Sequence, residues 1–307
     1  MREKIRFGLL EMALCIALAP LAAGASSATE NQTSEVTFRT SVEEVRVVFS
    51  ATDPQNRLIT KLDASQFAVI DEDRVVREFR SFGLSDYTRV EVAVLMDASG
   101  SISRQSGREL MNEVGLVANS GLVPNEALSI LSFRDKKTSL ICRGNCAAID
   151  LSAAIPEPEK TGLTPLYDSV VFASRMLGER ADDHTRKIIV LFSDGEDNIS
   201  LNSLSDAVEA AAKNDVAIYC ADAGDGGTTR GNRVLRAIAG VTGGLYFSHE
   251  ASAAQVLDAI KDNLHSSYTV SYKLPNHAEG FHLVRILPTH DLSLQFHCRR
   301  GYYYSEN

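Results

Sequence analysis

The chain has 307 residues and a net charge of −9, with 44% hydrophobic and 23% charged residues. This composition is typical of a globular protein with room for one large domain or two smaller ones. An acidic chain without a basic cluster repels phosphate backbones, so nucleic acid is not an expected partner.

The first 25 residues are typical of a secretory signal peptide. Three basic residues in the first six positions precede an apolar run over 7–22 and an Ala-Gly-Ala cleavage site at 23–25. A short buried helix or an uncleaved anchor is the alternative, but the run is short for a membrane span. We expect export to a periplasm or to the outside of the cell, with no transmembrane segment in the mature chain.

A polar stretch at 26–35 is expected to be a flexible leader, and two β-rich flanks enclose the rest of the chain. Short alternating runs separated by turn residues predict an N-terminal β module at 36–86 and a C-terminal β segment at 266–307. The predicted strands are 43–53, 57–62, 66–73, 77–82, 267–274, 282–289 and 292–304. Because a short isolated β segment cannot close a core, we expect the flanks to pair into a small β-sandwich, with two separate appendages as the alternative.

Apolar strands alternate with amphipathic helices over 87–265. The expected strands are 89–97, 126–133, 187–194, 216–224 and 245–248, and the expected helices are 104–119, 165–177, 203–214, 233–244 and 251–264. This alternation predicts an α/β fold with a doubly wound, mainly parallel sheet covered by helices on both faces. The predicted architecture is this domain inserted between the two β flanks.

Oxygen-bearing side chains follow the predicted strands in three places. Asp97, Ser99 and Ser101 end the strand 89–97, Thr164 precedes a helix, and Asp194 ends the strand 187–194. Ligands of open α/β sheets bind at the carboxyl ends of the strands. An all-oxygen set favours a hard cation, Mg²⁺ first, with Ca²⁺ or Mn²⁺ as alternatives. Any one of these residues could instead cap a helix.

The ordered set Asp97-x-Ser99-x-Ser101, Thr164 and Asp194 resembles the metal-ion-dependent adhesion site of von Willebrand factor type A (VWA) domains. The resemblance covers about 87–265, while the flanks look less specifically like bacterial secreted VWA-related proteins. It implies that Ser99 and Ser101 ligate directly, Thr164 directly or through water, and both Asp mostly through water.

This resemblance implies a non-enzymatic, exported protein-binding module in which the cation captures an Asp or Glu carboxylate of a partner protein. One alternative is a structural envelope protein whose VWA domain is stiffened by the metal. Another is a metal-dependent hydrolase, which needs a general base or nucleophile beside the metal; no His or Cys falls in the three clusters.

The cysteines and histidines carry further expectations. Cys142 and Cys146 form a close pair suited to a local disulfide in an oxidising compartment. Cys220 lies in an apolar run typical of a core, and the pairing state of Cys220 and Cys298 is left open. The histidines of the C-terminal flank are expected at the surface: His282, His290 and His297.

Overall fold

The computed structural model describes residues 44–85, 89–100, 102, 111–112, 114–115, 127–144, 146, 149–154, 162–179, 185–224 and 229–305. The predicted signal peptide and leader lie outside these residues, as do Ser101 and most of the predicted helix 104–119. No helix within the described stretches is long and apolar enough to span a membrane.

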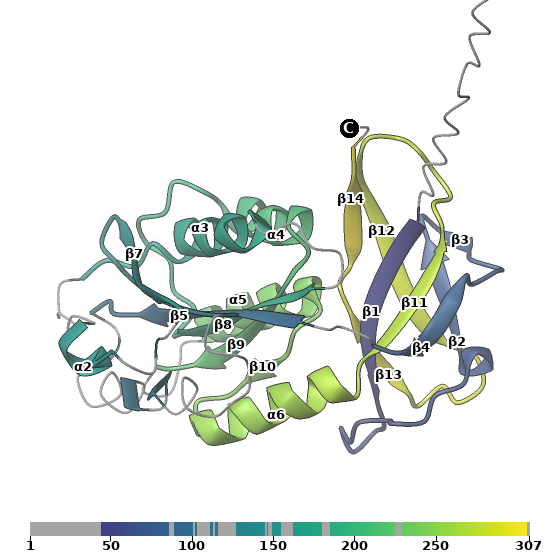
Figure 1. Cartoon of the computed structure of the whole chain (residues 1–307), viewed down its shortest axis with the longest axis horizontal. Coiled ribbons are helices and arrows are strands. Elements are labelled where there is room, and N and C mark those ends of the chain that lie inside the picture. The colour runs from purple at the N-terminus through teal and green to yellow at the C-terminus, as the bar shows by residue number, and fades with distance from the viewer. Residues whose placement is uncertain are drawn as a thin grey trace, which may run out of the picture. The chain divides into compact units, whose positions relative to one another are not determined.

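A six-stranded sheet in the order β10-β9-β8-β5-β6-β7 forms the centre of the α/β domain (Figure 1). Its strands are β5 (Arg89–Asp97), β6 (Leu128–Arg134), β7 (Lys137–Arg143), β8 (Thr185–Ser193), β9 (Val216–Asp222) and β10 (Tyr246–Phe247). Every neighbouring pair is parallel except β6 and β7. The prediction of a mainly parallel sheet is confirmed, and the antiparallel edge strand β7 is an addition to it.

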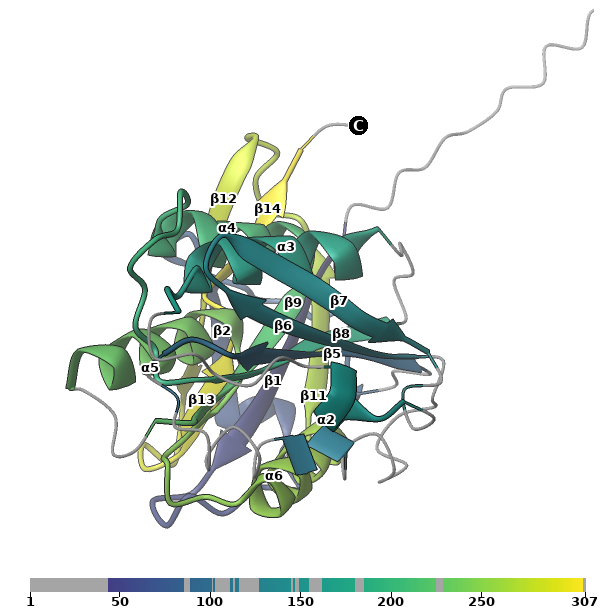
Figure 2. The same cartoon turned by 90° about the vertical axis from the view of Figure 1, so that its left-hand side faces the viewer.

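Helices cover both faces of this sheet (Figure 2). They are the short α2 (Leu151–Ala154), α3 (Leu166–Gly178), α4 (Leu204–Lys213), α5 (Thr229–Thr242) and α6 (Ala253–His265). Alternate β5 residues face opposite sides, so Ala93 and Leu95 pack with α3, α4 and α5, whereas Val92 and Val94 pack with α6. Burial on both faces accounts for the continuous apolar runs of these strands.

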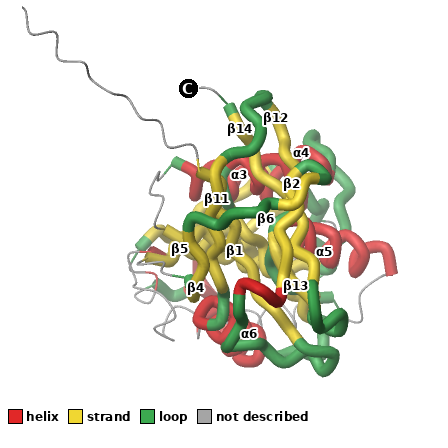
Figure 3. Tube along the Cα trace, turned by 90° about the vertical axis from the view of Figure 1, so that its right-hand side faces the viewer, coloured by secondary structure: helices red, strands yellow, loops and turns green. Residues whose placement is uncertain are grey.

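Two four-stranded antiparallel sheets form a sandwich, in the orders β13-β1-β11-β4 and β14-β12-β2-β3 (Figure 3). The N-terminal flank provides β1 (Glu44–Thr52), the short helix η1 (Ala64–Gln66), β2 (Phe67–Asp71), β3 (Arg74–Val75) and β4 (Ser81–Leu84). The C-terminal flank provides β11 (Tyr268–Lys273), β12 (Gly280–Pro288), β13 (Gln295–Cys298) and β14 (Gly301–Tyr304).

The two flanks share one hydrophobic core, as the sequence predicts. β1 pairs with β11 and β13, and β2 pairs with β12, so each sheet contains strands from both ends of the chain. The rings of Phe49 and Phe67 lie 5.1 Å apart between the sheets and pack with Tyr268 and Phe296. Neither flank could bury these aromatic side chains alone.

Two predicted strands were wrong. Residues 57–62 form no strand; only an isolated bridge joins Leu58 to Thr52. The predicted strand 292–304 divides into β13 and β14, which belong to different sheets. Arg299 and Arg300 turn the chain from one sheet to the other, and the Arg300 N–H donates to the Val241 carbonyl at 2.9 Å. A continuous apolar alternation does not reveal such a change of sheet.

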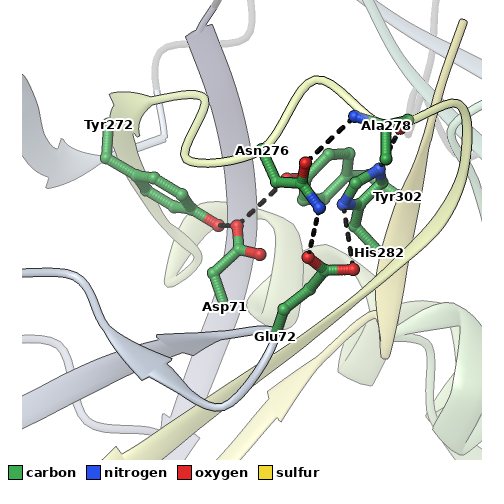
Figure 4. A network of polar contacts seen from close by, with 7 residues as sticks. All are labelled: Asp71, Glu72, Tyr272, Asn276, Ala278, His282 and Tyr302. Atoms are coloured by element: carbon green, nitrogen blue, oxygen red, sulfur yellow. Dashed lines mark hydrogen bonds and ion pairs between the residues drawn. The ribbon is translucent and has the colours of Figure 1, made fainter.

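A buried polar network crosses the sandwich (Figure 4). Asp71 on β2 accepts hydrogen bonds through Oδ2 from the hydroxyls of Tyr272 at 2.8 Å and Tyr302 at 3.1 Å. His282 is stacked on Tyr302 with ring centroids 5.1 Å apart, and its Nδ1 lies 3.2 Å from Glu72 Oε1. With 2% of its surface exposed, His282 is buried, so the expectation of a surface position was wrong.

Candidate metal centre

The predicted site lies at the carboxyl edge of the central sheet, where β5 ends at Asp97 and the neighbouring β8 ends at Ser193. A parallel sheet brings the ends of successive strands to one edge. Local sequence explains why the strands stop here: a small polar residue and a glycine follow each of them, at Ser99-Gly100 and Asp194-Gly195.

Asp97 is a desolvated carboxylate with neutral hydrogen-bond donors. It is 2% exposed; Oδ1 accepts from the Ser99 N–H at 2.8 Å, and Oδ2 accepts from the Ser193 hydroxyl at 2.7 Å. Burial raises the pKa of the Asp97 carboxyl to about 7, hydrogen bonds from Ser99 and Ser193 lower it, and the negative charge of Asp194 raises it. A cation at this edge would remove the cost of ionising Asp97.

The loop that carries Ser99 is tied to the loop that carries Thr164. The Gly100 N–H donates to the Gly162 carbonyl at 3.0 Å, and the Asp135 N–H donates to the Leu163 carbonyl. Ser99 and Thr164 are both buried. Two hydroxyls from distant parts of the sequence are therefore held at one edge.

The loop after β8 completes the arrangement through Asn198. Its Oδ1 accepts from the Thr164 N–H at 2.8 Å, and its own N–H donates to the Thr164 carbonyl at 3.1 Å. Asp194 is buried and accepts the Glu196 N–H at 3.0 Å. Gly195 has a φ of +79°, and a Cβ there would lie 2.3 Å from the Gly231 carbonyl oxygen, so this sharp turn requires glycine.

Two nearby acids fix this loop to the start of α3. Asp197 accepts from the Tyr167 N–H, and Asp168 accepts from the N–H groups of Leu201 and Asn202. Their oxygens hold backbone in place.

Four of the five predicted ligands therefore lie in hydrogen-bonded loops at one edge: Asp97, Ser99, Thr164 and Asp194. The fifth, Ser101, lies outside the described residues. Within the described stretches, no three His, Cys, Asp or Glu side chains gather in a way that could hold a metal ion. A metal here would depend on hydroxyl ligands as well as carboxylates, which is the donor chemistry of a hard cation.

Three residues at this edge were missed from sequence. Ser193 orients Asp97, Asn198 clamps Thr164, and Asp222 places a further buried carboxylate at the end of β9. Ser193 and Asp222 are the last residues of apolar strands, and Asn198 lies in the loop that follows β8. Their place after a strand is visible in the sequence, but only the strand register shows which residues Ser193 and Asp222 lie beside.

The structure joins Cys142 on β7 and Cys146 as a disulfide, with their Cα atoms 5.6 Å apart. Both residues are buried. Cys220 is a free, buried cysteine of β9, and Cys298 is free and partly exposed. The oxidation of the Cys142–Cys146 pair in an exported protein stays a prediction.

No family model and no curated protein matches the chain. Among solved structures, it is similar to proximal thread matrix protein 1 of the mussel byssus at 15% identity, over 58% of this chain and 48% of that one, with a TM-score of 0.44. It is also similar to manganese-loaded TRAP of Plasmodium vivax at 17% identity, over 73% of this chain and 98% of that one, with a TM-score of 0.44. A von Willebrand factor type A protein of Catenulispora acidiphila is similar at 11% identity, over 88% of this chain and 76% of that one, with a TM-score of 0.45. The chain spans about half the length of the mussel protein.

Proposed function

We propose that the protein is an exported, metal-dependent protein-binding module of the VWA type, without enzymatic activity. The observation that carries the proposal is the convergence of three hydrogen-bonded loops that hold Asp97, Ser99, Thr164 and Asp194 at the carboxyl edge of the sheet. All four side chains carry oxygen and all four residues are buried, which is the environment expected of a site for a hard cation.

The residues divide into two groups by charge. The Ser99, Ser101 and Thr164 hydroxyls are neutral and would hold the cation, whereas Asp97 and Asp194 would orient its water and balance its charge. A divalent cation, Mg²⁺ first, would supply an electrophilic centre with a position for an outside carboxylate. The partner is accordingly a protein that presents an Asp or Glu.

The test is partner binding with and without the cation. A partner captured in Mg²⁺ from the native cell envelope and released by EDTA would be purified and measured by surface plasmon resonance in both buffers. We expect binding in Mg²⁺ only, and its loss when one exposed Asp or Glu of the partner is changed to Ala. Equal affinity in Mg²⁺ and EDTA would contradict carboxylate capture.

The second candidate is a structural protein in which the cation only stiffens the loops. The hydrogen bonds that join the three loops support this alternative. It predicts that Mg²⁺ raises the unfolding temperature, while partner binding is the same in Mg²⁺ and EDTA. Thr164→Val separates the two, because it removes one hydroxyl from the edge and keeps the backbone bonds to Asn198. Capture requires this variant to bind the partner more weakly.

A further inference from the structure

Asp222, the last residue of β9, has a buried carboxylate oxygen without a hydrogen-bond partner. The residue is 6% exposed. Its Oδ1 accepts from the Gly224 N–H at 3.0 Å, whereas Oδ2 has no partner in the structure. A buried carboxylate oxygen that no donor satisfies is costly, so it requires a compensating positive charge or bound water.

The strand register places Asp222 beside the candidate metal centre. Asp222 is paired with Ser193 on the adjacent parallel strand β8, and the Ser193 hydroxyl donates to Asp97 on β5. Paired residues of parallel strands point to the same face of a sheet. Asp97, Ser193 and Asp222 therefore form a row across three neighbouring strands.

Charge links Asp222 to the same centre. Burial is the main cause that raises the pKa of Asp97 and of Asp222, and the negative charge of Asp194 adds to both shifts, so Asp194 interacts with both carboxylates. His249, which is exposed, acts on Asp222 in the opposite direction. Among the described residues no three His, Cys, Asp or Glu side chains gather to hold a metal ion, so an indirect role for Asp222 fits this geometry better than direct ligation.

We propose that Asp222 is a positioning residue of the metal centre, which sets the affinity for the divalent cation through its charge and through water held between it and Asp194. The inference rests on the proposed metal-dependent function. The third carboxylate increases the attraction for the cation. It also explains why an unsatisfied oxygen persists at this edge, where the cation would compensate it.

The test compares Mn²⁺ binding by Asp222→Asn with that of the wild type, using titration calorimetry. Asn keeps an oxygen for the Gly224 N–H and removes the charge. We expect the affinity to fall by about tenfold, whereas Asp222→Glu, which keeps the charge, stays within about threefold of the wild type. Glu279→Gln removes one charge from an exposed position in the sandwich and should leave Mn²⁺ affinity unchanged.

Thermal unfolding separates this role from a purely structural one. In EDTA, Asp222→Asn should unfold at the same temperature as the wild type or higher, because an unsatisfied buried charge is removed. The rise in unfolding temperature produced by Mn²⁺ should be smaller than in the wild type. The role of Asp222 would be overturned if Asp222→Asn bound Mn²⁺ with wild-type affinity, or if it were destabilised equally in EDTA and in Mn²⁺. Either result would leave the proposed metal-dependent function intact. A wild type without any Mn²⁺ binding would overturn the metal-dependent function, and the role of Asp222 with it.

Discussion

Asp71 in the sandwich and Asp97 in the α/β domain are both buried carboxylates, and their surroundings give them different tasks. Each accepts hydrogen bonds from two neutral groups, and burial is the largest cause that raises the pKa of each. Asp71 is bonded by two tyrosines in the sandwich, and the charge of the neighbouring Glu72 adds to the burial that raises its pKa. Asp97 lies at a sheet edge, with small hydroxyls around it and a second carboxylate nearby.

The two acids differ in where their hydrogen-bond partners come from. The partners of Asp71 come from β11 and β14, so its hydrogen bonds join the N-terminal flank to the C-terminal one (Figure 4). The partners of Asp97 come from its own loop and from β8, and the nearby charge of Asp194 opposes its ionisation. Asp71 joins the two flanks through Oδ2 and leaves its buried Oδ1 without a hydrogen-bond partner, whereas both oxygens of Asp97 are bonded. We propose that a cation at the sheet edge offsets the charges of Asp97 and Asp194.

The largest expected effect is a pH dependence of stability in the metal-free protein. The pKa of Asp97 is raised to about 7, above about 3.9 in the unfolded chain. The folded state therefore holds the proton more tightly, and its stability is greatest below about pH 4 and is lost as the pH rises through about 7. The shift corresponds to about 4 kcal/mol of unfolding free energy.

Urea unfolding from pH 4 to 8 in EDTA measures this loss, with Asp97→Asn as the control that lacks the titrating group. The wild type should lose about 4 kcal/mol relative to Asp97→Asn across this range, and Mg²⁺ should remove most of the difference because it favours the ionised carboxylate. Parallel pH profiles of the two proteins in EDTA would contradict this account of Asp97.

The next effect concerns the sandwich. Asp71→Ala leaves the buried hydroxyls of Tyr272 and Tyr302 without their acceptor, so we expect the unfolding free energy to fall by about 3 kcal/mol. Mg²⁺ affinity should not change. Urea unfolding and calorimetry measure the two quantities, and Glu279→Ala at an exposed position should alter neither. If Asp71→Ala weakened Mg²⁺ binding as much as it weakened the fold, the division between the two acids would be wrong.

The sequence predicted the fold where patterns are local. Continuous apolar runs identified β5, β8 and β9, and the alternating flanks identified the sandwich. The division between β13 and β14 could not be predicted, because the turn at Arg299 depends on contacts with α5, including the bridge from Arg299 to Thr242. His282 was misplaced for a similar reason: its burial depends on Tyr302, twenty residues away in the sequence.

The predicted site shows the same limit. Asp97, Ser99, Thr164 and Asp194 follow a spacing that is visible in the sequence. Ser193 and Asp222 become meaningful only through the register of β5, β8 and β9, which no single-sequence pattern specifies. Residues that belong to a sequence motif are therefore easier to predict than residues that the strand register brings beside them.

The most direct test of the account is a Mg²⁺ titration of three proteins by calorimetry: the wild type, Asp97→Asn and Asp71→Asn. If Asp97 belongs to a cation site and Asp71 to the hydrogen-bonded network of the sandwich, the wild type and Asp71→Asn bind with the same affinity, and Asp97→Asn binds roughly a hundredfold more weakly. Unchanged affinity in Asp97→Asn, or no binding by the wild type, would contradict the assignment of the carboxyl edge as a metal centre.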